Sequence, residues 1–192
     1  MKKGDYLKGG FTIIEVVLVL AVAGLIFAMA FIAVPSLQRS QRDNDRRDDM
    51  LTFVSEVKRY QTSNRGNLPG SGDTLPKQVV WSSDWETTKP AANTWAGFYN
   101  SYLGKMFIDP DGTNYRLSIV DCNAKRVDAN CEGGALTAIN ALKASTFSNN
   151  NHTMLVVARG KCVGDNIVGS SSPRNLAVMY HLEGSGVYCY GT

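Results

Sequence analysis

The longest apolar run in the sequence extends over residues 11–34 and contains a single charged residue, Glu15. Twenty-four residues form an α-helix of about 36 Å, long enough to cross a hydrocarbon core of about 30 Å. Gly24 lies within this run and Pro35 follows it, and both residue types weaken a helix. We therefore predict a membrane-spanning helix that melts locally at these two positions. For Gly24 a second interpretation stays open, because glycine is common in membrane helices.

The next stretch, residues 38–49 (QRSQRDNDRRDD), has no apolar side chain and carries four arginines and four aspartates. A helix that is polar on all sides does not pack on a globular core. The arginines and aspartates also recur at i,i+4 spacing, as in Arg39–Asp43 and Asp43–Arg47, which supports an exposed helix. We predict a solvated helix face for this stretch.

Amphipathic spacing returns after residue 49. Apolar side chains then recur at helical intervals at Met50, Phe53, Val54, Val57 and Tyr60. Gly66 offers a helix stop and Pro69 ends the segment. The pattern predicts one long helix over about residues 11–63, whose second half presents an apolar stripe to a sheet.

The C-terminal part of the chain has shorter patterns. Residues 70–90 are rich in Gly, Ser, Asp and Pro and predict a loop, and an aromatic stripe over residues 95–106 predicts a short helix. Strands are predicted at residues 115–121, 153–160, 177–182 and 187–190. The last two are joined by EGSG, which is typical of a hairpin. The predicted fold class is α+β, a long N-terminal helix packed against an antiparallel sheet.

The residues that precede the apolar run have the form of a processing site. A secretory signal places its small-residue cleavage site after the apolar run, whereas here Gly10 stands before it. Cleavage after Gly10 would remove a short basic leader and keep the helix in the mature chain. Glu15 would then lie four residues from the new amino terminus at Phe11. Ionisable residues in membrane helices usually mark function, and the natural partner of Glu15 is the α-ammonium of a neighbouring copy. A pair with the amine of the same helix stays open, because the two groups are four residues apart.

Residues Gly10, Phe11, Thr12 and Glu15 together resemble the class III signal peptide of type IV prepilins. The resemblance is clear over residues 1–69 and architectural beyond them. It implies that a prepilin peptidase cuts after Gly10 and N-methylates Phe11. It also implies that Glu15 neutralises the Phe11 amine of an adjacent subunit during assembly.

The resemblance further implies a function and a location. The chain would be a structural subunit of a type IV pilus, a helical homopolymer used for adhesion or twitching motility. The precursor would lie in the inner membrane, meet an assembly platform there, and end as an extracellular surface filament. The expected divisions are a leader (residues 1–10), a transmembrane and filament-core helix (residues 11–35) and an extracellular head (residues 36–192).

Three alternatives stay open. A minor pilin, or a pseudopilin of a type II secretion or DNA-uptake system, needs the same amino terminus. The A-x-A site at residues 28–30 permits an ordinary secretory signal. A signal-anchored binding domain would use the apolar helix only for attachment. All of them place the lysine-rich amino end on the cytoplasmic side.

Charge and motifs exclude other classes. The leader holds three lysines and one aspartate, so its removal lowers the net charge from +3 to +1. That balance gives no argument for a nucleic-acid partner. No nucleophile elbow, P-loop or dinucleotide fingerprint occurs, and His152 and His181 are isolated in the sequence. We expect no enzyme, no cofactor and no metal, and we interpret residues 108–112 (IDPDG) as a turn, not a calcium loop.

The four cysteines, Cys122, Cys131, Cys162 and Cys189, lie in the part predicted outside the membrane. An even count in an oxidising compartment favours two disulfides, and three connectivities are possible. We favour Cys122–Cys131, which closes a short loop, and Cys162–Cys189, which ties the end of one strand to the last strand. The second pair also resembles the disulfide-bounded C-terminal region of many pilins.

The processing site yields the first testable prediction. Gly10→Val should block maturation, because a small residue is needed where the chain is cut before Phe11. Mass spectrometry of the assembled wild-type protein should find a chain that begins at methylated Phe11. A mature chain that begins at Phe31 would instead establish ordinary secretion.

Overall fold

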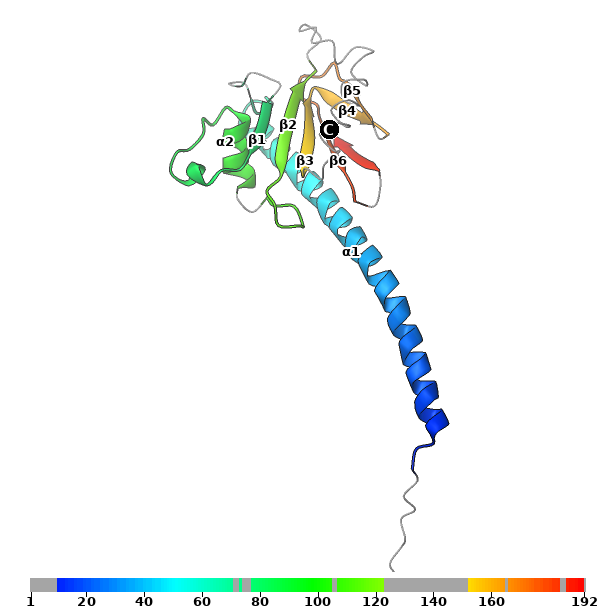
Figure 1. Ribbon diagram of the computed structural model, residues 1–192. Coiled ribbons are helices and arrows are strands. Elements are labelled where there is room, and N and C mark those ends of the chain that lie inside the picture. The colour runs from blue at the N-terminus through cyan, green and yellow to red at the C-terminus, as the bar shows by residue number, and fades with distance from the viewer. Residues whose placement is uncertain are drawn as a thin grey trace, which may run out of the picture. The chain divides into compact units, whose positions relative to one another are not determined.

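The computed structural model describes residues 10–70, 73, 77–104, 107–122, 152–164, 166–183 and 186–191 (Figure 1). The chain divides into two compact units, Met1–Ser40 and Gln41–Thr192. Helix α1 (Ile13–Ser63) contributes its first part to one unit and its second part to the other. Each unit is described by itself below.

Helix α1 matches the predicted long helix closely. Gly66 ends it, because its left-handed backbone (φ +82°) turns the chain and its N–H donates to the Gln61 carbonyl at 2.7 Å. The helix is continuous through Gly24 and Pro35. Local melting at these two positions in a filament stays a prediction.

The second unit is built on a five-stranded sheet with the order β1-β2-β3-β6-β7 (Figure 1). Its strands are β1 (Lys77–Val80), β2 (Arg116–Asp121), β3 (Thr153–Ala158), β6 (Leu176–His181) and β7 (Val187–Gly191). A separate two-stranded sheet pairs β4 (Gly160–Val163) with β5 (Asn166–Gly169). The α+β class is confirmed.

One strand pair differs from the expected antiparallel arrangement: β2 and β3 run parallel, with Ser118 opposite Leu155. A parallel pair needs a connection of about a dozen residues or more, and 31 residues separate Asp121 from Thr153 in the sequence. Three described strands were missed in the sequence. Strand β1 and the 3₁₀ turn η1 (Ser83–Glu86) lie in the stretch predicted as loop. The strand predicted over residues 153–160 ends at Ala158, and β4 and β5 follow it as a separate pair.

The core lies between α1 and the large sheet. The predicted apolar stripe of α1 is buried, and it packs on the inward-facing side chains of β2, β3 and β6: Leu117, Ile119, Met154, Val156, Leu176 and Val178. Helix α2 (Trp95–Phe98) and the π-helical turn η2 (Tyr99–Leu103) add aromatic rings, where the sequence predicted one short helix. Phe53 of α1 stacks on Trp95, with ring centroids 6.4 Å apart, and meets the edge of Phe98 at 5.9 Å.

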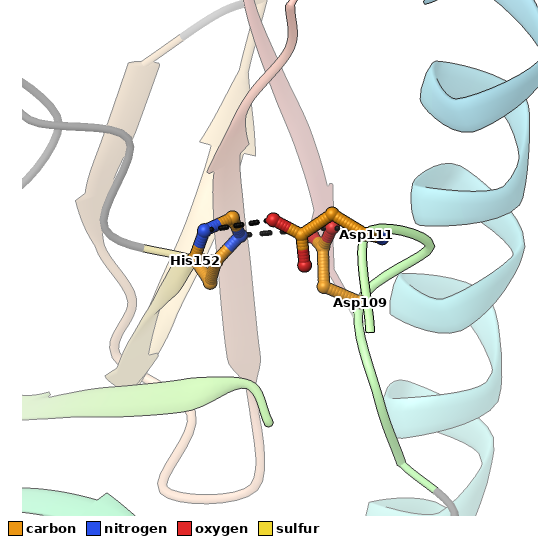
Figure 2. A group of neighbouring side chains, drawn as sticks. All are labelled: Asp109, Asp111 and His152. Carbon is orange, nitrogen blue, oxygen red and sulfur yellow. Dashed lines mark hydrogen bonds and ion pairs between the residues drawn. The ribbon is translucent and has the colours of Figure 1, made fainter. Parts of the chain in front are cut away.

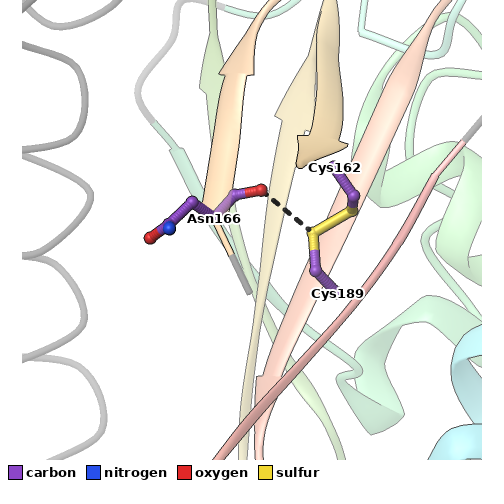
Figure 3. Close-up of a disulfide and its surroundings, with 3 residues drawn as sticks. All are labelled: Cys162, Asn166 and Cys189. Carbon is purple, nitrogen blue, oxygen red and sulfur yellow. Dashed lines mark hydrogen bonds between the residues drawn. A yellow bond between two sulfur atoms is a disulfide. The ribbon is translucent and has the colours of Figure 1, made fainter. Parts of the chain in front are cut away.

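A disulfide joins Cys162 of β4 to Cys189 of β7, with Cα atoms 5.9 Å apart (Figure 3). The Cys162–Cys189 prediction is confirmed. The Cys189 Sγ also lies 3.8 Å from the Asn166 carbonyl oxygen, a contact without a shared proton because a disulfide sulfur carries none. Cys122 is disulfide-bonded as well. Cys131 lies outside the described residues, so the Cys122–Cys131 pair stays a prediction.

Replacement of both Cys162 and Cys189 by alanine should lower the free energy of unfolding by about 3–4 kcal/mol, because the bond closes a loop of 27 residues in the unfolded chain. Denaturant titration of the full-length protein in detergent would measure the change. Val163→Ala, at an exposed position beside Cys162, is the matched control and should leave the midpoint nearly unchanged. Equal midpoints for all three proteins would contradict a stabilising role.

Candidate functional site

Thr12 and Glu15 close the amino end of α1. The Thr12 backbone N–H and hydroxyl donate to the Glu15 Oε2 at 2.9 and 2.8 Å, and the Glu15 N–H donates to the Thr12 Oγ1 at 3.4 Å. This reciprocal pattern is a capping box, which satisfies backbone donors at a helix start. This cap was not predicted from the sequence, although the T-x-x-E spacing of Thr12 and Glu15 signals it.

The cap leaves part of the Glu15 carboxylate open. Both Thr12 donors reach Oε2, and no described residue donates to Oε1. The positive end of the helix dipole also favours a negative charge in the first turn of a helix. The amino end of α1 therefore holds a carboxylate with one oxygen fixed by the chain and one oxygen free for a cation.

The surface around this carboxylate is apolar and open. Phe11 is 89% exposed, and no described residue between 11 and 34 is buried. The Gly10 Cα has no heavy atom within 4 Å of the position that a Cβ would take. The helix is long and apolar enough to cross a membrane. Apolar surface of this extent marks contact with a membrane or another protein.

The polar stretch of α1 is not solvated throughout, so that prediction is wrong for two of its residues. Asp43 is 7% exposed and Arg46 is 3% exposed. The Arg46 Nε and Nη2 donate to the two carboxylate oxygens of Asp109, both at 2.8 Å. The Arg46 Nη1 lies 2.7 Å from the Glu183 Oε1. Polar partners from distant parts of the chain cover this face of the helix, which is why it is buried without any apolar side chain.

Further hydrogen bonds extend this contact, which we name the Arg46 network. It comprises Arg42, Asp43, Arg46, Asp109, Tyr180 and Glu183. Arg42 donates to both oxygens of Glu183, with the shortest distance 2.6 Å, and the Tyr180 hydroxyl donates to the Asp109 Oδ2 at 2.8 Å. The Glu183 N–H donates to the Asp43 Oδ1 at 2.8 Å. The network joins α1 to the turn at Asp109 and to the β6–β7 hairpin.

The Arg46 network lowers the pKa of two carboxyls, those of Asp109 and Glu183. Burial would raise the pKa of Asp109, but hydrogen bonds from Arg46, Tyr180 and the Asp111 backbone outweigh it and lower the pKa to about 2. The Glu183 pKa also falls to about 2, chiefly through its hydrogen bonds with Arg42. Both carboxylates are therefore ionised at neutral pH, and their ionised forms stabilise the folded state.

Three side chains beside the network could offer ligands to a metal: Asp109, Asp111 and His152 (Figure 2). The His152 Nε2 lies 3.0 Å from the Asp111 Oδ2, and its Nδ1 lies 3.6 Å from the Asp109 Oδ1, so His152 is not isolated as the sequence suggested. Both oxygens of Asp109 already accept hydrogen bonds from the Arg46 guanidinium. A metal bound there would compete with this buried cation, so the donor set does not favour a metal. The turn expected at residues 108–112 is confirmed by the Gly112 N–H, which donates to the Asp109 carbonyl at 2.8 Å.

The predicted site residues thus lie in two separate regions. Gly10, Phe11 and Glu15 lie at the amino end of α1, whereas Cys162 and Cys189 lie in the second unit. At Gly24 an added Cβ would meet nothing within 4 Å, so packing within the chain does not require glycine there. Comparison with known proteins finds no matching family model, curated protein or solved structure.

The depressed pKa of Asp109 predicts acid sensitivity. A carboxyl whose folded pKa lies below its unfolded value of about 3.9 contributes stability above that pH and loses it as pH falls toward the folded value of about 2. The free energy of unfolding should therefore decline between about pH 4 and pH 2. Asp109→Asn should reduce this slope and lower stability at pH 7 by about 3 kcal/mol, because the buried Arg46 loses its bidentate partner.

Chemical denaturation at a series of pH values would measure both effects. Asp45→Asn, at an exposed position next to Arg46 on α1, is the matched control and should keep the wild-type slope. A slope in Asp109→Asn equal to that of the wild type would mean that other carboxyls cause the acid transition.

Proposed function

We propose that this chain is a structural subunit of a type IV pilus, assembled into a surface filament through the apolar first part of α1. The observation that carries the proposal is the amino end of that helix. There an open Gly10–Phe11 pair precedes the exposed apolar part of α1, residues 13–34, whose only charged residue is Glu15. One oxygen of the Glu15 carboxylate has no donor among the described residues. A lipid bilayer would cover this surface before assembly, and other copies of the helix would cover it afterwards.

Glu15 would supply the directional contact in this assembly. Cleavage after Gly10 creates a positively charged amine on Phe11, and in apolar surroundings an unpaired charge of either sign is costly. The amine of one subunit would pair with the Glu15 Oε1 of its neighbour, while Oε2 continues to cap its own helix through Thr12. Such a contact joins two different surfaces of the subunit. When the same contact repeats from subunit to subunit and does not close into a ring, it produces a helical filament.

The second unit would form the displayed head of each subunit. It has its own apolar core, the Cys162–Cys189 disulfide and the buried Arg46 network. Disulfides persist in oxidising compartments, which supports a position outside the cytoplasm. A prepilin peptidase and a membrane assembly platform would be the partners of the precursor.

Three substitutions separate the assembly role of Glu15 from its capping role. Glu15→Gln removes the charge and keeps a residue that serves in a capping box, whereas Glu15→Val removes both functions. Thr12→Ala removes the cap and leaves the carboxylate. We expect both Glu15 variants to be processed and inserted into the membrane. Their filament yield should be at least about tenfold below wild type, because a tenfold change corresponds to the loss of about 1.4 kcal/mol at each contact between subunits. Thr12→Ala should retain most filaments.

Filaments sheared from cells and quantified by immunoblot give the yield, with whole-cell protein and leader cleavage as controls for folding and processing. Normal filaments in Glu15→Gln would refute the charge-pairing proposal and leave Glu15 as a capping residue. If filaments persist in both Glu15 variants but lack this chain, the chain is a minor subunit of a filament built from another protein.

A further inference from the structure

The second unit has a cleft of about 400 Å³ at the C-terminal end of α1. Three arginines and one aspartate line it together with apolar side chains: Arg65, Arg159, Arg174, Asp121, Leu68 and Pro173. Its residues come from the turn after α1, the ends of β2 and β3, and the segment before β6. None of them belongs to the amino end of α1 on which the filament proposal rests.

The cleft carries an excess of positive charge. Arg159 forms a two-point ion pair with Asp121, in which Nε donates to Oδ1 at 2.6 Å and Nη2 contacts Oδ2. Among the described residues that line the cleft, Asp121 is the only one with a carboxylate, and this pair uses it. Arg65 and Arg174 also line the cleft and form no ion pair with any described residue.

Arg174 is held in place at the wall of the cleft. Its carbonyl accepts a hydrogen bond from the Gln61 side chain at 2.8 Å. Its guanidinium lies over Gly66, where an added Cβ would come within 2.7 Å of the Arg174 Nε. Arg65 and Arg159 both have left-handed backbones, with φ of 58° and 59°. At Arg65 this conformation belongs to the end of α1. At Arg159 it is a conformation uncommon for residues other than glycine.

Helix electrostatics offer a competing explanation. The C-terminal end of a helix carries a partial negative charge, and cations near it are stabilising. Arg65 and Arg174 lie near the last turn of α1, so this effect alone could account for their positions. It does not account for a cleft with apolar walls between them, nor for the separate pairing of Arg159 with Asp121.

We propose that this cleft binds an organic oxyanion, a carboxylate or phosphate carried on a small body such as a sugar. Guanidinium groups bind both anions through paired N–H donors, and two unpaired groups on one cleft provide this chemistry. Leu68 and Pro173 would contact the body of the ligand. The proposal concerns ligand binding by the second unit and does not depend on filament assembly.

Isothermal titration calorimetry of the full-length protein in an uncharged detergent tests the proposal. Glucuronate serves as the carboxylate probe, glucose 6-phosphate as the phosphate probe, and glucose as the neutral control. We expect saturable binding of at least one anionic probe, with Kd of about 1 mM or below, and none of glucose. The affinity should fall as salt is raised, because salt screens exposed charges.

Arg65→Gln is the decisive variant, because Arg65 is exposed and has no described ion pair to lose. It should weaken binding at least about fivefold, and the double variant with Arg174→Gln should lose at least about tenfold, about 1.4 kcal/mol. Arg116→Gln removes the same charge from an exposed position at the opposite end of β2 and should leave binding unchanged.

Three results would overturn the proposal: no saturable binding of either anion up to about 10 mM, equal binding of glucose, or full binding by the Arg65→Gln and Arg174→Gln double variant. The titration uses unassembled protein, so these outcomes leave the filament proposal untouched. A failure of the filament test likewise leaves the cleft as it is.

Discussion

The buried contact of Arg46 with Asp109 fixes how α1 lies on the sheet of the second unit. The apolar stripe of α1 supplies most of the buried surface, but apolar contacts are non-directional and tolerate a shift along the helix. A two-point ion pair with both N···O distances at 2.8 Å has one geometry only. Because Asp43 and Glu183 bond to the same group, a shift of α1 by one turn would leave several buried charges unpaired at once.

The carboxylates of Asp109 and Glu15 lie in different environments, and this difference bears on their roles. Both oxygens of Asp109 are satisfied within the chain, and its side chain is buried, so it has nothing left to offer another molecule. Glu15 also bonds to its own chain, but only through Oε2, and its surroundings are open. Asp109 thus has hydrogen bonds to both carboxylate oxygens, whereas Glu15 has hydrogen bonds from described residues to one oxygen only. This difference supports an intermolecular role for Glu15 and a structural one for Asp109.

Local periodicity made much of the fold predictable. The extent of α1, the buried stripe from Met50 to Tyr60 and the β6–β7 hairpin follow from spacing and residue type. The Cys162–Cys189 bond was one of three possible connectivities and was favoured from the expected strand positions and the resemblance. The failures are non-local. Arg46 is buried by partners 63 and more residues away, and the parallel β2–β3 pair depends on a long connection, so no local window contains either signal. The capping box could be predicted from the spacing of Thr12 and Glu15. The same residues also fit the processing motif, and they were interpreted through that motif alone.

The Cys162–Cys189 bond has a mechanical consequence. Strand β7 lies at the edge of the large sheet, where a pull on the chain end opens the hydrogen bonds of a strand one after another. The bond to β4 stops such peeling at Cys189, so only Tyr190 and Gly191 of this strand can separate before a covalent link bears the load. The hairpin connection to β6 holds the other end. Strand β7 is therefore anchored at both ends, by the disulfide at Cys189 and by its connection to β6.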